Sequence, residues 1–359
     1  MSTIKVLHVI ARMNVGGTAR YVSELVENIS DSALVTGFVQ GAEIEDPTLE
    51  RFSVFRVRHL GRKISPVDDF KAWLELRKLV QVLNPQIIHT HTFKAGLVGR
   101  LIGGNHKRVH TFHGHLFDDQ SFSVMEKRII TLVEKFLAKR TDLLISVGEK
   151  VGVELRAAGI GTTKEWVSIP PGVTPLPTVN KSTAKGLLGL KEDQLFVGWM
   201  ARMVEVKNPH LLLEVAKRLP SLNFVMAGGG ELLSEIANMA PSNVSVIGWA
   251  DASTFWSAVD CALSTSDNEG MPIALIEAQL AGLPVIATDV GSNSEVIQNG
   301  VSGLICNKDV DSIVRALQGL MSNKELLRAM GGDSKLWANT SFKPEKMITK
   351  HVQSYERLS

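Results

Sequence analysis

The chain has 359 residues, of which 44% are hydrophobic and 21% charged, and its formal net charge at pH 7 is +2. This composition is typical of a soluble globular protein and excludes disordered, collagen-like and low-complexity chains. Two cysteines, Cys261 and Cys306, are too few for a disulfide framework or a four-thiolate zinc site, and no apolar run is long enough for a signal peptide or a membrane span.

Short runs rich in β-branched residues alternate with stretches of helical spacing along the chain. In the first half, residues 21–29 have helical spacing, and strands are predicted at 4–10, 87–88, 109–112, 143–145 and 166–169. Residues 169–177 contain four prolines and a glycine, which excludes a helix or a central strand and predicts a linker. Beyond the linker, strands are predicted at 195–200, 222–227, 244–247, 261–264 and 285–287.

Strands that alternate with helices predict βαβ units and parallel sheets. We therefore expect an α/β protein with two doubly wound, Rossmann-like domains over residues 1–172 and 173–342, and a cleft between them as the natural ligand site. Residues 343–359 predict a final amphipathic helix, because apolar side chains recur there at helical spacing: Met347, Ile348, Val352 and Tyr355.

Two features of the first half lie where predicted strands end. Gly16 and Gly17 open a helix, whose N–H groups would approach a phosphate or sugar hydroxyls, although a plain tight turn fits equally well. The G-x-G-x-x-G pattern is absent, which disfavours a nicotinamide dehydrogenase. We expect His113 to touch substrate, with a buried structural histidine, or a metal ligand together with His115, as alternatives. His89 and His91, at another strand end, are expected to pack.

The second half carries a pair of cations on one loop. Arg202 and Lys207 follow a predicted strand, and two cations at a strand's carboxyl end suit a diphosphate, whereas either alone would be an ordinary surface charge. No D-x-D motif lies at a strand end to hold Mg²⁺, and Asp118-Asp119 is expected to be a solvated loop. The sequence therefore predicts that these cations, and not a metal, stabilise a leaving diphosphate.

A pair of glutamates follows the strand predicted at 261–264. Glu269 precedes Gly270, and Pro272 suits the first position of a helix that would contain Glu277. The N-terminus of that helix can accept an anion. A buried Glu277 would need hydroxyl donors, such as those of a ribose.

These motifs, in this order, resemble those of the retaining GT-B glycosyltransferases of family 4, the glycosyl transferases group 1. The resemblance covers essentially the whole chain and rests on Gly16-Gly17, His113, Arg202-x4-Lys207, the E-x7-E pair Glu269/Glu277, Ala281–Thr288 and Val290-Gly291. It implies a GT-B fold, with an acceptor-binding N-terminal domain, a nucleotide-sugar-binding C-terminal domain and a last helix that crosses back to the N-terminal domain.

The resemblance also implies roles for individual residues. His113, Glu269, Arg202 and Lys207 would be catalytic, with Glu269 at the donor sugar and the two cations at the diphosphate. The donor would be held by Gly16, Gly17, Arg202, Lys207, Glu269, Gly270, Met271, Pro272, Ile273 and Glu277, the last at the ribose. No metal and no cofactor are expected. The chain departs from the family at Met271-Pro272, where Phe-Gly is common, and at Pro171-Gly172, where Asn-Gly is usual.

We therefore expect a cytoplasmic, metal-independent, retaining hexosyltransferase that uses a nucleotide sugar, most readily a UDP-sugar, and a hydroxyl acceptor. Alternatives on the same fold are a sugar-nucleotide epimerase, a glycosyl phosphorylase, and a non-catalytic subunit that binds a nucleotide sugar.

The charge distribution bears on the acceptor. Residues 1–172 carry 23 Lys and Arg against 18 Asp and Glu, whereas the rest carries 16 against 19. Residues 123–140 combine an apolar face with basic residues, which suits either a membrane surface or an ordinary sheet-packing helix. A lipid-linked saccharide acceptor in polysaccharide or glycan assembly, met at the inner face of a membrane, is the resulting hypothesis. Nucleic acid is not expected, because aromatic residues are only 6% and are not interleaved with the charges.

Overall fold

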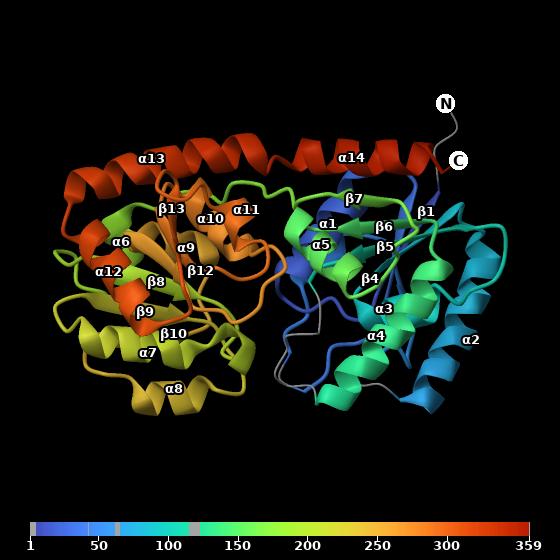
Figure 1. Cartoon of the computed structure of the whole chain (residues 1–359), viewed down its shortest axis with the longest axis horizontal. Coiled ribbons are helices and arrows are strands. Elements are labelled where there is room, and N and C mark those ends of the chain that lie inside the picture. The colour runs from blue at the N-terminus through green and yellow to red at the C-terminus, as the bar shows by residue number, and fades with distance from the viewer. Residues whose placement is uncertain (1–4, 42, 62–64, 115–122, 359) are drawn as a thin grey trace. The chain divides into compact units, whose positions relative to one another are not determined.

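A computed structural model of the chain describes residues 5–41, 43–61, 65–114 and 123–358 (Figure 1). His115 and Asp118-Asp119 lie outside the described residues. The chain forms two compact units: unit 1 contains the described residues up to Gly172 and those from Pro344 onward, and unit 2 contains Val173–Lys343. Each unit is an α/β domain built on one parallel sheet.

The sheet of unit 1 has seven parallel strands in the order β3-β2-β1-β4-β5-β6-β7. Leu7 and Val9 of β1 pack in one apolar cluster with α2 and α3, whereas Ile10 packs on the other face with α1. Both faces are therefore covered, which explains why the central strands are continuous apolar runs. The strands are β1 Val6–Ile10, β2 Ser32–Thr36, β3 Val54–Arg56, β4 Ile87–His91, β5 Lys107–Phe112, β6 Leu143–Ser146 and β7 Trp166–Ser168.

The helices of unit 1 begin at recognisable caps. Ser65 accepts a hydrogen bond from the backbone of Asp68 at the start of α2, and Ser123 forms a capping box with Glu126 at the start of α4. The helices are α1 Gly17–Asn28, η1 Pro47–Arg51, α2 Pro66–Leu83, α3 Phe93–Gly99, α4 Val124–Lys139, α5 Glu149–Ala157 and α14 Pro344–Glu356.

The last helix, α14, belongs to unit 1 and packs beside α1 (Figure 1). The hydroxyl of Tyr21 lies 2.7 Å from Nε2 of His351, and the hydroxyl of Tyr355 lies 2.6 Å from Nδ1 of His89. Met347 and Tyr355 are buried as their spacing predicts, and His351 is buried between them. Polar aromatic contacts therefore hold this helix, as well as apolar ones.

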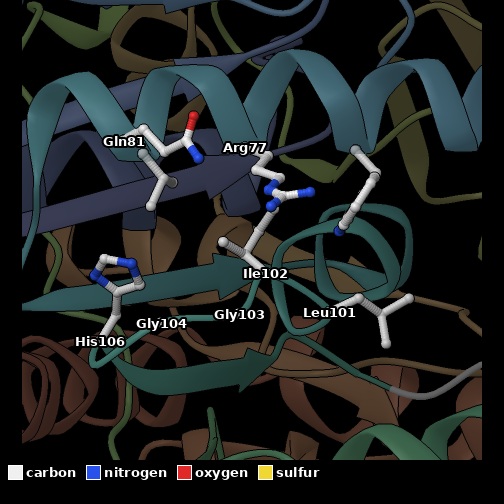
Figure 2. A pocket seen from close by; sticks show the side chains of 9 residues that line it. Arg77, Gln81, Leu101, Ile102, Gly103, Gly104 and His106 are labelled. Atoms are coloured by element: carbon white, nitrogen blue, oxygen red, sulfur yellow. The ribbon is translucent and has the colours of Figure 1, made fainter.

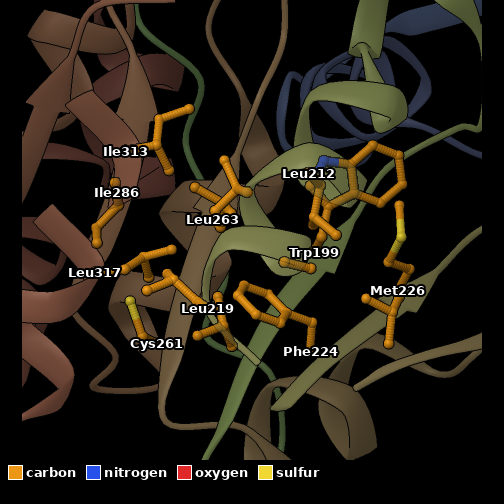
Figure 3. Packing of buried hydrophobic residues seen from close by; sticks show 14 of the residues in the cluster. Trp199, Leu212, Leu219, Phe224, Met226, Cys261, Leu263, Ile286, Ile313 and Leu317 are labelled. Carbon is orange, nitrogen blue, oxygen red and sulfur yellow. The ribbon is translucent and has the colours of Figure 1, made fainter. Parts of the chain in front are cut away.

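The sheet of unit 2 has six parallel strands in the order β10-β9-β8-β11-β12-β13. Val197 and Trp199 of β8 contribute to a large apolar cluster (Figure 3), whereas a side chain at Gly198 would meet Phe255 on the opposite face. Both cysteines are buried and unbridged. The strands are β8 Phe196–Met200, β9 Asn223–Ala227, β10 Val244–Gly248, β11 Cys261–Ser264, β12 Val285–Thr288 and β13 Gly303–Cys306.

The helices of unit 2 are α6 Lys181–Leu187, η2 Glu205–Lys207, α7 Pro209–Arg218, α8 Leu233–Met239, α9 Ala252–Ala258, α10 Ile273–Leu280, α11 Asn293–Val296, α12 Val310–Met321 and α13 Lys324–Ser341. None of the described helices combines the length and the apolar character that a membrane crossing requires. Residues 169–180 form neither helix nor strand, as predicted for a linker.

The alternating pattern of strands and helices is confirmed. Every strand predicted from the sequence is present, whereas β2, β3 and β13 escaped prediction because they are short or partly polar. One detail differs: α10 begins at Ile273, so Pro272 is its N-cap and not its first residue.

Candidate functional site

In unit 2, the predicted site residues gather at the carboxyl edge of the sheet. Arg202 and Lys207 lie on the connection after β8, and Glu269 lies on the connection after β11. Because β8 pairs directly with β11 and the strands are parallel, these two loops are neighbours. This is the edge at which open α/β sheets bind ligands.

The two loops are joined by an ion pair. The Nζ atom of Lys207 lies 2.6 Å from Oε1 of Glu269, and the hydroxyl of Ser266 donates to the same oxygen at 2.7 Å. The side chains of Lys207 and Glu269 are 21% and 10% exposed, so solvent screens the pair only partly. The cation and the carboxylate, which the sequence analysis treated separately on two loops, therefore form one ion pair.

Hydrogen bonds from Asn208 and Thr265 fix the backbone next to Lys207. Asn208 caps α7 from a left-handed conformation, with its side-chain oxygen 3.1 Å from the backbone nitrogen of Leu211. The hydroxyl of Thr265 donates to the Asn208 carbonyl at 2.8 Å and accepts from Nε1 of the core residue Trp199 at 3.0 Å. The position of the lysine is thus tied to the core of unit 2.

Gly291 allows a third loop to approach Glu269. Its φ is +47°, and a Cβ there would lie 1.8 Å from the Glu269 carbonyl oxygen. The backbone nitrogen of Ser292 donates to the Gly270 carbonyl at 3.0 Å. No other residue type fits this position without moving the glutamate loop.

Glu277 lies inside α10 and is 5% exposed, on a helix whose other residues, apart from Gln279, are apolar. Met271 and Ile273 are also buried, whereas Gly270 is half-buried and Arg202 is exposed. The structure therefore brings Lys207, Glu269 and Gly270 together at the sheet edge, with Arg202 on the same loop as Lys207.

In unit 1, Gly16 is the N-cap of α1 and Gly17 its first residue, and both are exposed. No side chain caps this helix end. Its first N–H groups therefore lack the side-chain partner that a serine or aspartate would supply.

His113 follows β5, is half-buried, and belongs to a group of histidines. Its Nε2 lies 3.1 Å from Nδ1 of His91, and its ring stands edge-on to Tyr21 with centroids 4.9 Å apart. We call this group the histidine cluster; its members, on β1, β4, α14 and the end of β5, are His8, His89, His91, His113 and His351.

Burial keeps the cluster uncharged near neutral pH. It lowers the pKa of His8 and of His113 to about 3, and it lowers the pKa of the other three well below the usual value. His8, His89 and His91 have ligand atoms within 4.8 Å of one another, close enough to hold a metal ion. From the sequence, the pair considered as metal ligands was His113 with His115. The group of His8, His89 and His91 could not be predicted, because β1 and β4 are neighbours only in the fold.

Two family models match the chain: "Glycosyl transferase 4-like domain" over residues 16–172, and "Glycosyl transferases group 1" over residues 180–337. The chain belongs to the group 1 glycosyl transferases. It is thus an enzyme that transfers a sugar from a nucleotide sugar, and the family predicted from its motifs is confirmed.

Known relatives agree. The chain is 29% identical to the UDP-Gal:alpha-D-GlcNAc-diphosphoundecaprenol alpha-1,3-galactosyltransferase of Escherichia coli, over 90% of both chains. It is 26% identical to the O-antigen biosynthesis glycosyltransferase WbnH of E. coli, over 89% of this chain and 91% of the relative.

Solved structures confirm the GT-B fold. Anabaena Alr3699/HepE in complex with UDP and glucose has a TM-score of 0.85 at 17% identity, covering 99% of this chain and 100% of the other. Sucrose-phosphate synthase from Thermosynechococcus elongatus has a TM-score of 0.84 at 18% identity, covering 99% of both chains.

This glycosyltransferase also presents an unusual helix surface. Helix α4 buries Ile130, Leu137 and Ala138, together with Glu134, which pairs with Arg100 at 2.7 Å. Its opposite face exposes apolar side chains to 50–68%: Val124, Met125, Ile129, Leu132 and Phe136. Helix α4 therefore does pack on unit 1, with Ala138 in a cluster with Phe112 and Leu144 of the sheet, but the apolar face that was expected to meet the sheet is the one turned outward.

Unit 1 also contains a cavity of about 490 Å³ between α2 and the loop before β5 (Figure 2). Trp73, Arg77 and His106 are among its lining residues. It lies at the amino end of β5, whereas His113 follows the carboxyl end. None of the predicted site residues lines this cavity.

Proposed function

We propose that this glycosyltransferase is a retaining, metal-independent hexosyltransferase that uses a UDP-sugar. The observation that carries the proposal is the Lys207–Glu269 pair at the carboxyl edge of the unit 2 sheet. It sets a point charge for a leaving diphosphate directly beside a carboxylate that can accept hydrogen bonds from sugar hydroxyls. The relatives support the donor, since one name specifies UDP-Gal and one structure contains UDP and glucose.

In this proposal, Arg202 and Lys207 stabilise the charge that develops on the diphosphate as the glycosidic bond breaks. Glu269 orients the donor sugar, and Glu277 accepts hydrogen bonds from the ribose. The acceptor hydroxyl attacks from the face that the diphosphate leaves, so the configuration at the sugar carbon is kept. Positioning and electrostatic stabilisation lower the barrier, and no side chain need form a covalent intermediate.

The remaining predicted residues surround the same donor. We propose that the N–H groups at Gly16 and Gly17 bind the diphosphate and the acceptor, and that His113 contacts the donor sugar. Gly270, Met271 and Ile273 line the donor near its phosphates. Pro272 supplies no N–H there, unlike the glycine common in the family, and this difference is expected to alter sugar preference.

We further propose that the acceptor is a lipid-linked saccharide and that α4 rests on an anionic bilayer. The exposed apolar face of α4 is flanked by the exposed cations Arg128, Lys139 and Arg140. An apolar stripe edged with cations is the pattern of helices that lie in a membrane interface. The E. coli relative, named for a diphosphoundecaprenol-linked acceptor, supports this choice. The protein would then work at the cytoplasmic face of the membrane.

A thermal-shift series with UDP-, GDP- and ADP-hexoses tests the donor. A ligand that binds only the folded state raises the Tm, by an amount set by its concentration relative to Kd. We expect the UDP-hexoses alone to give a clear rise, and Lys207→Ala to reduce it. Lys217→Ala is the matched control, because Lys217 is exposed on α7 and paired with Glu214. A rise with GDP- or ADP-hexoses only would overturn the choice of donor.

A further inference from the structure

Three imidazole rings of the histidine cluster form a row from the end of β5 into the sheet. Nε2 of His113 lies 3.1 Å from Nδ1 of His91, and Nε2 of His91 lies 3.2 Å from Nδ1 of His8. His8 and His91 are fully buried, whereas His113 is half-buried. His113, the half-buried ring that we expect at the donor sugar, is thus linked to His91 and His8, which are too deeply buried to contact a ligand.

The row has only two possible arrangements of protons. Each ring is neutral near pH 7, so it carries one N–H donor and one acceptor nitrogen. His91 uses both of its nitrogens in the row, so it must accept from one neighbour and donate to the other. Either every bond donates toward His8, or every bond donates toward His113.

The far nitrogen of His8 decides between them. Its Nε2 is buried and has no hydrogen-bond partner among the described residues. If the row donated toward His8, this nitrogen would carry a buried N–H with no acceptor. If the row donates toward His113, the nitrogen carries only a lone pair. Buried N–H groups without an acceptor are the rarer case in folded proteins, so the second arrangement is favoured.

We propose that His8 and His91 are positioning residues that set the tautomer of His113, so that its Nε2 accepts from His91 and its Nδ1 carries the proton. His113 then offers an N–H donor, and not a lone pair, to an oxygen of its ligand. That the ligand is the donor sugar rests on the proposed function. The tautomer itself does not depend on any ligand.

A metal ion among His8, His89 and His91 is the competing explanation, and the contacts disfavour it. Both nitrogens of His89 are engaged, with the hydroxyls of Tyr355 at 2.6 Å and Thr111 at 2.7 Å. Both nitrogens of His91 are also engaged, with Nε2 of His113 at 3.1 Å and Nδ1 of His8 at 3.2 Å.

His110 provides an internal reference. The Thr90 hydroxyl donates to the Val109 carbonyl at 3.2 Å, so it must accept from Nδ1 of His110, which lies 2.8 Å away. His110 should therefore be an Nδ1–H tautomer in every variant of His91.

Long-range ¹H–¹⁵N NMR on the full, ¹⁵N-histidine-labelled chain without ligand tests the proposal. We expect Nδ1–H for His113 in the native protein, and an increase of Nε2–H in His91→Leu, where the donor is lost. His91→Asn should restore Nδ1–H, because its amide can donate from near the lost Nδ1. In transfer assays His91→Leu should lose about tenfold in kcat/KM, the worth of one hydrogen bond, with UDP affinity unchanged.

The outcomes separate this inference from the proposed function. An Nε2–H signature for His113 in the native protein, or one equivalent of zinc bound to the three buried rings, would overturn the tautomer assignment. Neither result would contradict the proposal that unit 2 binds the donor. An Nδ1–H signature in a protein that binds no UDP-sugar would overturn the proposed function and leave the tautomer standing. If His91→Leu fails to fold, the native spectrum and His91→Asn still decide.

Discussion

The two units arrange their ionisable side chains in opposite ways, unit 1 within and beside its sheet and unit 2 on loops at the carboxyl edge of its sheet. Unit 1 buries uncharged imidazoles, linked by hydrogen bonds of 2.6–3.2 Å, among β1, β4, β5 and α14. Unit 2 places a charged pair, Lys207 and Glu269, on loops where it is partly exposed. A neutral cluster can orient side chains and a ligand, whereas a charged pair can stabilise a charge that develops during the reaction. The comparison predicts that unit 1 is sensitive to acid and that unit 2 is sensitive to loss of a single charge.

The largest expected difference between the two units is in their stability at low pH. The clustered histidines of unit 1 have lowered pKa values in the folded state, so the unfolded state binds more protons below about pH 6.5. The free energy of unfolding should therefore fall as pH drops from about 6.5 toward 3, by up to about 1.4 kcal/mol per pH unit for each histidine. Unit 2 contains a single histidine, the partly exposed His210.

Hydrogen exchange at pH 7, 6, 5 and 4 checks this difference by mass spectrometry, because it reports on each unit separately. Peptides from β1, β4 and α14 should lose protection at a higher pH than peptides from β8 and β11. Simultaneous loss in both units, or earlier loss in unit 2, would contradict the prediction.

Removing the charge of Lys207 should have the next largest effect, chiefly on activity. Lys207→Ala should lower turnover at least ~10²-fold, since loss of one preorganised stabilising group costs about 2.7–4 kcal/mol. Some loss of Tm is also expected, because Lys207 and Glu269 are only 21% and 10% exposed and the substitution leaves the carboxylate without its cation. The hydroxyl of Ser266, which still donates to Glu269, limits that loss. Steady-state transfer assays with Arg202→Ala alongside, and Lys217→Ala as control, measure it. Near-native rates in both site variants would remove the diphosphate role.

The charged site of unit 2 could be predicted from the sequence, whereas the histidine cluster of unit 1 could not. The charged residues of unit 2 follow recognisable strands within short motifs, so their sheet edge is predictable. Their pairing is not, because it depends on β8 lying beside β11. The histidine cluster combines His8, His351 and the His89/His91 pair from segments far apart in the chain, and only the strand order and the docking of α14 bring them together.

The fold follows the same rule. Strong apolar runs such as 143–145 and 285–287 identify central strands, because both faces of a parallel sheet are buried. Strands β2, β3 and β13 carry weaker patterns because they are short or partly polar. The outward face of α4 could not be assigned either, since an apolar stripe looks the same whether it meets a sheet or a membrane.

Smaller effects should distinguish the two glutamates. Glu277→Ala should weaken binding of free UDP by roughly 1.5–3 kcal/mol, the value of hydrogen bonds to a charged group. Glu269→Ala should leave UDP binding nearly unchanged and reduce transfer, because its proposed partner is the sugar. Calorimetry with UDP on both variants, with Glu277→Gln to keep the shape, measures this. The reverse pattern would exchange the two roles.

The weakest effect expected concerns the membrane. Each cation near an anionic bilayer contributes about 1 kcal/mol, and salt screens that contribution within ~8–10 Å. Arg128→Gln with Lys139→Gln should therefore weaken sedimentation with anionic vesicles at low salt, and Leu132→Asn should weaken it further. Val82→Asn is the matched control, because Val82 is an exposed apolar residue on α2. Equal binding by all variants, or none by the native protein, would remove α4 as the membrane contact.

The central claim is sugar transfer from a UDP-hexose with retention and without metal. It is tested most directly by incubating the protein with UDP-hexose labelled in the sugar and an undecaprenyl-diphosphate-linked saccharide, in excess EDTA, and by NMR of the product. We expect label on the lipid-linked saccharide, in a glycosidic bond with the donor's anomeric configuration. An inverted linkage, an epimerised nucleotide sugar, a hexose 1-phosphate, or transfer that appears only when Mg²⁺ or Mn²⁺ is restored would contradict it.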